Sequence, residues 1–243
     1  MKKLFAMTVA VLLLFSVLLG IPAAYGQAPE TGKTLDILFS HDTHSHLNTF
    51  TTVVDEKEAE IGGFARANTL IKAQRAKDPD TLVIDGGDFS MGTLIQTVFE
   101  TQAAELRMLG CMGYDVTTFG NHEFDYGFEA LKKNMENAQF PVLAANVKYN
   151  GELAFDDAAV FTTPGGTKIG VFGLETPETA TKAHPAKIKG VTILGDKSMF
   201  DCAQAQVDSL KADGCDYIIC LGHLGIDKES IGNRSTDLLN VVD

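Results

Sequence analysis

The chain contains one polar segment that reads Gly120-Asn121-His122-Glu123-Phe124-Asp125-Tyr126-Gly127. It follows a short β-prone run, residues 115–119, and precedes a helical pattern that begins near residue 128. In a strand–loop–helix unit, the loop at the carboxyl end of the strand is where α/β proteins place catalytic groups. Because this loop offers an amide oxygen, an imidazole and two carboxylates, we interpret it as a catalytic loop, with an ordinary solvated turn as the alternative.

Outward from this segment, apolar strands alternate with amphipathic helices, which is typical of an α/β fold. The expected strands are 35–39, 81–84, 115–119, 160–163, 168–174 and 217–221, and the expected helices are 64–76, 98–109, 128–137 and 199–212. The residues between the first strand and the first helix are expected to form a polar loop. A Pro-Gly-Gly turn is expected to join the strands 160–163 and 168–174 as a hairpin.

Metal-type ligands follow four of these strands. They are Asp42 with His44, then Asp88, then Asn121 with His122, and finally His223. In an extended segment, residues two apart point to the same side, so Asp42 and His44 can converge on one cation. The flexible pair Gly86-Gly87 lets the chain turn sharply, so that both oxygens of Asp88 can reach inward to two ions. Since the carboxyl ends of the strands meet at one crevice, we expect the four sets to lie together.

In these motifs the chain resembles the calcineurin-like metallophosphoesterases, and within them the secreted 5′-nucleotidase group that includes the 2′,3′-cyclic-nucleotide 2′-phosphodiesterases. The resemblance covers residues 34–243. It is carried by Asp42-Thr43-His44, Gly86-Gly87-Asp88, Gly120-Asn121-His122-Glu123 and Gly222-His223-Leu224-Gly225, with Ile61-Gly62-Gly63-Phe64-Ala65-Arg66 and Phe124-Asp125-Tyr126-Gly127 as features of the group. It implies an α/β fold, a four-layer sandwich of two mixed β-sheets flanked by helices, incomplete at the C-terminus.

The resemblance also implies two divalent metal ions, of Zn, Mn, Mg, Ca or Co, at the edge of the sheets. Asp42 and His44 would bind one ion. Asn121 and His223 would bind the other, and Asp88 would bridge the two. Two dications about 3.5–4 Å apart repel strongly, so the carboxylates must supply compensating negative charge. The implied reaction is the in-line attack of a metal-bound hydroxide on the phosphoester of a nucleotide.

His122 and Asp125 are the expected catalytic residues. His122 directly follows the expected ligand Asn121 and is therefore held near the phosphate, where its imidazolium could stabilise charge or protonate the leaving alkoxide. The spacing of three residues places Asp125 next to His122, where it would orient the ring and raise its pKa. Glu123 is expected to cap the following helix or to contact Arg66.

The N-terminal residues 1–26 have the charged and apolar regions of a secretory signal peptide. Met1-Lys2-Lys3 precedes an apolar run from Leu4 to Ile21, and Ala24 and Gly26 form a small-x-small cleavage site. An uncleaved membrane anchor is the alternative. The expected organisation is a signal peptide at 1–26, a flexible lead-in at 27–33 and one metallophosphoesterase domain at 34–243. We expect an exported protein in the periplasm, at the cell surface or outside the cell, with no stable membrane span after cleavage.

Composition limits the class of partner. The formal net charge is −12, which disfavours a nucleic-acid polymer because such binding uses a basic face. The expected partner is a nucleotide or another small phosphoester, and the expected state is a monomer. The four cysteines include no Cys-x-x-Cys pair, so zinc-finger and thioredoxin chemistry are disfavoured, and buried free thiols are favoured over a disulfide.

The family resembled carries a Gly-His-x-His segment shortly after the strand that delivers the histidine matched by His223, and the sequence reaches Asp243 before such a segment. Each expected ion would then lack one histidine. We expect residues 27–243 alone to bind metal weakly and to show little or no phosphatase activity. Two alternatives stay open, a hydrolase of another phosphoester such as a UDP-sugar, and a non-catalytic module that binds a metal or a partner.

Overall fold

The computed structural model describes residues 35–243, so the predicted signal peptide at 1–26 and the lead-in at 27–33 lie outside the described residues. The strands are β1 (Ile37–Ser40), β2 (Thr49–Val54), β3 (Lys57–Gly62), β4 (Leu82–Asp85), β5 (Val116–Thr118), β6 (Val142–Leu143), β7 (Val147–Tyr149), β8 (Glu152–Leu153), β9 (Ala158–Thr162), β10 (Lys168–Glu175), β11 (Val191–Ile193) and β12 (Tyr217–His223). The helices are α2 (Phe64–Lys77), α3 (Phe99–Gln102), α4 (Ala104–Met112), α5 (Phe128–Met135), α6 (Thr179–Lys182), α7 (Asp196–Ala212) and α8 (Ser235–Leu238). Within residues 35–243, no helix is long and apolar enough to cross a membrane.

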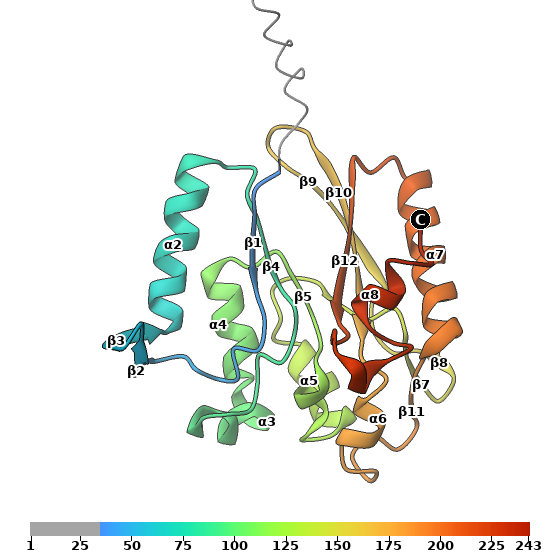
Figure 1. Cartoon of the computed structure of the whole chain (residues 1–243), viewed down its shortest axis with the longest axis horizontal. Coiled ribbons are helices and arrows are strands. Elements are labelled where there is room, and N and C mark those ends of the chain that lie inside the picture. The colour runs from blue at the N-terminus through green and yellow to red at the C-terminus, as the bar shows by residue number, and fades with distance from the viewer. Residues whose placement is uncertain (1–34) are drawn as a thin grey trace, which may run out of the picture. The chain divides into compact units, whose positions relative to one another are not determined.

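Two sheets form the centre of the fold (Figure 1). The first has the order β1-β4-β5-β6 and is parallel throughout. The second has the order β12-β10-β9, in which β10 runs parallel to β12 and antiparallel to β9. The Pro-Gly-Gly hairpin predicted from the sequence is therefore confirmed as β9–β10. A small antiparallel sheet, β11-β7-β8, and the hairpin β2–β3 lie outside the two central sheets.

Three apolar clusters separate four layers of structure. In the first cluster, helices α2, α4 and α5 pack on the outer face of the first sheet, with Leu109 fully buried among them. In the second, Ile84 of β4 and Val171 of β10 fill the space between the two sheets. In the third, Met199 of α7 packs with Phe172 of β10 on the far side of the second sheet. Because neighbouring strand residues point to opposite faces, Val171 and Phe172 serve different layers, and the predicted four-layer architecture is confirmed.

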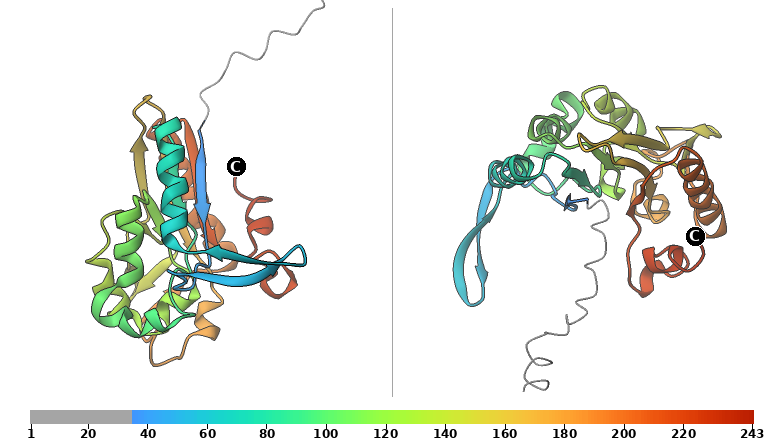
Figure 2. Two further views of the ribbon diagram at one scale, coloured as in Figure 1. Left: turned by 90° about the vertical axis from the view of Figure 1, so that its left-hand side faces the viewer. Right: turned by 90° about the horizontal axis from the view of Figure 1, so that it is seen from above.

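The predicted polar loop after β1 is wrong, because residues 49–62 contain the hairpin β2–β3. The segment Thr49–Val54 is rich in β-branched residues, which favour a strand even where the surroundings are polar. Asp55 and Glu56 occupy the turn between the two strands with positive φ. The hairpin projects from the body of the domain in both views of Figure 2.

The predicted helix 98–109 is interrupted at Ala103, whose φ of 45° separates α3 from α4. The carbonyl oxygen of Phe99 accepts both the amide of Ala103 at 3.1 Å and Nδ2 of Asn134 at 2.8 Å, so a side chain from α5 contacts α3 next to the break. The helices predicted at 64–76, 128–137 and 199–212 are confirmed, with ends that shift by at most three residues.

All four cysteines are free, as predicted, but their burial differs from the expectation. Cys111 on α4 and Cys220 on β12 are exposed, so the prediction of burial is wrong for these two. β12 is an edge strand of its sheet, and this position leaves part of its surface open to solvent.

Asp85, the last residue of β4, is buried beneath the carboxyl edge of the first sheet. Ser40 donates a hydrogen bond to its Oδ2 at 2.5 Å, and the hydroxyl of Thr117 and the amide of Gly87 donate to its Oδ1, both at 3.0 Å. Tyr114 extends the network, because its hydroxyl lies 2.9 Å from Oγ of Ser40. Burial raises the pKa of Asp85 to about 6, and the hydrogen bonds offset part of that effect.

Asp85→Asn should make the stability of the protein less dependent on pH. The unfolded chain loses the Asp85 proton near pH 3.8, whereas the folded protein keeps it up to about pH 6, so the free energy of unfolding falls as the pH rises through this window. A shift of roughly 2 units limits the loss to about 3 kcal/mol. Since the asparagine can still accept from Gly87 and can donate to Ser40, the variant should gain stability relative to the wild type between about pH 4 and about pH 7. Urea denaturation at both pH values measures this gain, and a constant difference would contradict it.

Candidate active site

The loops that follow β1 and β4 run side by side and carry three of the predicted ligands. The amides of Asp42 and His44 donate to the carbonyl oxygens of Gly87 and Asp88, both at 3.0 Å. Asp42 and His44 adopt φ of 49° and 44°, so the segment is not extended, as the sequence argument had assumed. The two side chains converge because the backbone is paired with the neighbouring loop, and not because residues two apart share one side of a strand.

Two groups of three side chains in this region could each hold a cation. One group contains His44, Asp88 and His122, and the other contains Asp42, Asp88 and His223. Within each group the candidate ligand atoms lie within 4.8 Å of one another. Asp88 belongs to both groups, and its predicted role as a bridge between two ions stays a prediction.

The geometric groups differ from the predicted pairing of ligands. Oδ1 of Asp42 lies 3.7 Å from Nε2 of His44 and 4.0 Å from Nε2 of His223, so Asp42 lies between these two histidines. His122, which the sequence predicted as a catalytic residue and not as a ligand, belongs to the first group. The assignment of each residue to a particular ion stays a prediction.

His223 reaches the site from the end of β12. Its Nδ1 faces the carbonyl oxygen of Gly86 at 2.9 Å, and its Nε2 lies 3.4 Å from Oδ2 of Asp88. Burial disfavours the charged form of both groups, but their mutual attraction is stronger: it lowers the pKa of Asp88 and raises that of His223. The ring is therefore held with one nitrogen on the protein backbone and the other directed at the shared carboxylate.

Asn121 and His223 line the same small polar pocket, whose volume is about 280 Å³. Other lining side chains, Glu178 and Lys182, come from the segment around α6 and pair with each other at 2.9 Å. The shared pocket brings Asn121 and His223 together, as the sequence predicted.

The predicted contact between His122 and Asp125 is present. Nδ1 of His122 lies 2.7 Å from Oδ2 of Asp125, at the end of the short 3₁₀ turn Asn121–Phe124. The ring of His122 meets the ring of His44 edge-on, with 5.3 Å between their centroids. Because Nδ1 faces Asp125, Nε2 is the nitrogen left for a substrate or an ion.

Two glycines let the loops after β4 and β5 touch. A Cβ on Gly87 would lie 2.3 Å from the carbonyl carbon of Phe119, and a Cβ on Gly120 would lie 2.1 Å from Oδ1 of Asp88. Asp88 adopts φ of 50°, and its Oδ1 accepts the amide of His122 at 2.9 Å. A left-handed conformation is uncommon and costly for a residue with a side chain, so contacts with the neighbouring loop hold Asp88 in place.

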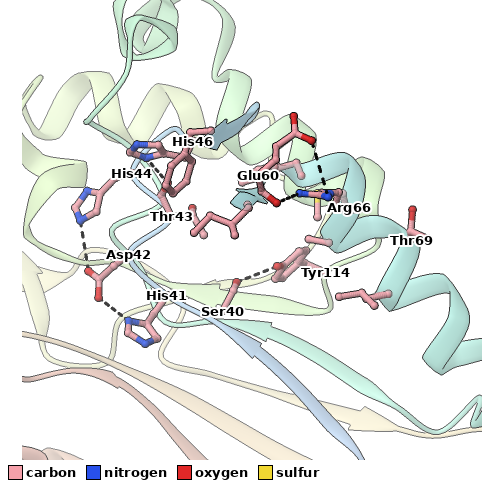
Figure 3. A pocket seen from close by; sticks show the side chains of 18 residues that line it. Ser40, His41, Asp42, Thr43, His44, His46, Glu60, Arg66, Thr69 and Tyr114 are labelled. Atoms are coloured by element: carbon pink, nitrogen blue, oxygen red, sulfur yellow. Dashed lines mark hydrogen bonds and ion pairs between the residues drawn. The ribbon is translucent and has the colours of Figure 1, made fainter. Parts of the chain in front are cut away.

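A larger cavity of about 890 Å³ opens beside Asp42 and His44, with walls from the hairpin β2–β3 and from α2. Figure 3 shows Asp42 and His44 at one side of this cavity and Arg66 beside Glu60 at the other. Arg66 donates from Nη1 to the carbonyl oxygen of Glu60 at 2.5 Å. The predicted contact between Arg66 and Glu123 is therefore wrong.

Two buried acids near the site, Glu123 and Glu175, were not among the site residues predicted from the sequence. Glu123 accepts the amide of Gly120 and so caps its own 3₁₀ turn, not the following helix as predicted. Burial and the charge of Asp88 raise the pKa of Glu123 to about 8. Glu175 ends β10 in register with His223, and burial raises its pKa to about 8. The sequence could have identified Glu175, because it lies at the carboxyl end of a buried strand. Asp88 was predicted as a ligand because it follows another such strand.

Comparison with known proteins assigns the family. Residues 36–240 match the family described as calcineurin-like phosphoesterase. The chain belongs to this family. The predicted superfamily is thus confirmed. Membership of this family implies divalent metal ions, and their identity and number stay predictions.

The relatives of this phosphoesterase include 5′-nucleotidases. The 5′-nucleotidase of Mus musculus is 32% identical in an alignment 224 residues long, which covers 88% of this chain and 38% of the mouse protein. The NAD 5′-nucleotidase of Haemophilus influenzae is 33% identical in an alignment 242 residues long, which covers 92% of this chain and 38% of that protein. The solved structure of the H. influenzae NAD nucleotidase has a TM-score of 0.68 at 32% identity and covers 80% of this chain and 35% of that one. The chain therefore spans less than two fifths of the length of these relatives.

In this phosphoesterase, Gly120→Ala should displace the carboxylate of Asp88, because the added methyl group would overlap Oδ1. We expect the affinity of the full-length protein for Mn²⁺ to fall by about 10–100-fold, the usual effect of disturbing the support of a metal ligand. Titration calorimetry measures the affinity.

Gly110→Ala is the matched control. Its Cβ would lie at an ordinary 3.4 Å from the side chain of Gln139, and alanine within α4 stabilises a helix by up to about 1 kcal/mol relative to glycine. This control should bind Mn²⁺ as the wild type does. Equal affinity in Gly120→Ala would show that the close approach to Asp88 is unimportant for the site.

Proposed function

We propose that the chain carries the catalytic metal centre of an exported enzyme that hydrolyses the phosphoester of a nucleotide, either a 5′-nucleotide or a 2′,3′-cyclic nucleotide. The observation that carries this proposal is the pair of ligand groups that share Asp88, next to the contact between His122 and Asp125. The names of the mouse and H. influenzae relatives support a nucleotide as the substrate. The signal-like pattern of residues 1–26 supports export.

The donor set fits two divalent ions. Each geometric group combines carboxylate and imidazole ligands, which suit ions such as Mn²⁺ and Zn²⁺. Asp42 and Asp88 bring negative charge, and Asn121 with His223 would add neutral donors from one pocket. When bound, the ions would supply positive charge to the phosphate and lower the pKa of water.

His122 is the group best placed to act on the leaving oxygen. Asp125 lies 2.7 Å from Nδ1 of His122 and would fix the orientation of the ring. A proton on Nε2 would then pass to the alkoxide oxygen as the bond from that oxygen to phosphorus breaks. Asp125 would act only through the ring of His122.

Hydrolysis assays test the proposal directly. With Mn²⁺, Zn²⁺ or Mg²⁺, a protein that contains this chain together with the Gly-His-x-His segment of the family should hydrolyse AMP or 2′,3′-cyclic AMP, and a chelator should abolish the activity. UDP-glucose serves as the competing substrate class, and preferential hydrolysis of it would place the enzyme with the nucleotide-sugar hydrolases. Tight metal binding without turnover of any of these esters would support a non-catalytic metal-binding module and contradict the proposal.

Asp88→Ala should lower the metal content of both positions together, because one carboxylate serves both ligand groups. His122→Ala is the contrasting variant. It should keep both metals and lower kcat by about 10²–10⁴, which is what a lost general acid normally costs. Elemental analysis and steady-state kinetics on both variants provide the measurement. Two tightly bound ions in Asp88→Ala would rule out the shared role, and metal loss in His122→Ala would make His122 a ligand.

The leaving group separates proton donation by His122 from simple charge stabilisation. If His122 donates a proton, His122→Ala should slow the hydrolysis of AMP far more than that of p-nitrophenyl phosphate, because nitrophenolate departs without a proton. Asp125→Asn should give a smaller defect in the same direction, since it disturbs the orientation of the ring without removing it. Equal losses on both esters would indicate a purely electrostatic role.

A further inference from the structure

Glu123 is a fully buried acid that connects the loop of Asp88 to the loop of Asn121, with an exposed fraction of 0%. Its Oε2 accepts the amide of Asp88 at 2.9 Å and the amide of Gly120 at 2.7 Å. Its Oε1 accepts the amide of Ser90 at 2.9 Å and the hydroxyl of Ser90 at 2.7 Å. One carboxylate thus receives four hydrogen bonds from two loops that are far apart in the sequence.

The connection between the two loops runs in both directions. Glu123, on the loop after β5, accepts the amide of Asp88, while Asp88, on the loop after β4, accepts the amide of His122 at 2.9 Å. Asp88 also adopts a left-handed conformation that it would rarely hold by itself. The two carboxylates therefore hold the backbones of the two ligand loops at a fixed distance from each other.

The two other buried glutamates of residues 35–243 do not have this arrangement. Glu105 and Glu175 each accept a hydroxyl, from Ser45 and Thr179 respectively, and each leaves Oε2 without a hydrogen-bond partner among residues 35–243. Glu123 instead accepts three backbone amides and one hydroxyl. A carboxyl group that accepts three backbone amides can fix the geometry of the loops. One that accepts a single hydroxyl constrains only the side chain that donates to it.

We propose that Glu123 is a positioning residue for the metal centre, which sets the separation of the loops of Asp88 and Asn121 and hence the spacing of the two ion positions. The inference rests on the proposed function, because it concerns the same ions. Its chemistry requires an acid of this length. An amide would turn an N–H towards at least one of the four donors, and a shorter acid would not reach both loops.

Glu123→Gln and Glu123→Asp test the inference in the full-length protein, with Mn²⁺ as the ligand. Glu123→Gln keeps the size of the side chain but loses acceptors, so we expect Mn²⁺ binding to weaken by about 10–100-fold. Glu123→Asp keeps the carboxyl group but is one methylene shorter, so it should weaken binding as well. Near-normal binding in Glu123→Asp would mean that the length of the side chain does not matter, and would overturn the positioning role.

Amide resonances provide a readout that does not depend on activity. In a ¹H–¹⁵N spectrum, the amides of Asp88, Ser90 and Gly120 should shift upfield in Glu123→Gln, because hydrogen bonds to a carboxylate are stronger than those to an amide. Unchanged resonances together with unchanged Mn²⁺ binding would reduce Glu123 to a space-filling role. Glu105→Gln is the matched control, a buried acid with one hydroxyl partner, and it should lower the melting temperature without changing Mn²⁺ binding.

A second variant covers the case in which the Glu123 variants fail to fold. Ser90→Ala removes only the hydroxyl contact, so the protein should fold and still bind Mn²⁺ about two- to tenfold more weakly. Unchanged affinity in Ser90→Ala would then overturn the inference. A wild-type protein that binds no Mn²⁺ would overturn the proposed function itself, whereas normal binding in both the wild type and Glu123→Gln would overturn only the role of Glu123.

Discussion

The contact between the loop after β4 and the loop after β5 is the constraint on which the site depends. Neighbouring parallel strands lie about 4.8 Å apart, so their ends can share a ligand only if no side chain separates the loops. Gly87 and Gly120 meet this condition, because a Cβ at either position would collide with the other loop. The space at Gly120 is filled by the carboxylate of Asp88, which belongs to both candidate ligand groups.

This arrangement costs stability in the protein itself. Asp42, His44 and Asp88 have left-handed backbone conformations, and burial raises the pKa of Glu123 and of Glu175. Each of these features opposes folding, and each lies within the loops or strand ends that the site uses. Locally unfavourable structure in the loops that carry the ligands is what a preorganised site requires. The layers of apolar packing behind it, from Leu109 to Met199, provide the compensating stability.

The sequence was informative about the layers and the strand ends, because these follow from hydrophobic period and from the geometry of parallel sheets. It was less informative where a contact between distant segments overrides the local pattern. The convergence of Asp42 with His44 was predicted for the wrong reason, since it depends on pairing with Gly87 and Asp88 and not on an extended chain. Three of the four hydrogen bonds of Glu123, those from Asp88 and Ser90, likewise depend on distant partners. The hairpin β2–β3 is different, because its β-branched residues were a visible local signal that the polarity of the segment obscured.

The candidate ligands would contact metal ions and phosphate oxygens, and this limits how far they can discriminate among substrates. Asp42, Asp88 and His223 would contact only the phosphoryl group, so they would not distinguish two esters of the same type that carry different alcohols. Discrimination between such substrates requires contacts with the rest of the ester, and binding energy gained there is what distinguishes one from another in the transition state. Those contacts would have to come from groups other than these ligands. Metal binding and substrate preference therefore report on different parts of the molecule, so a variant such as Glu123→Gln should weaken metal binding without changing the order in which substrates are preferred.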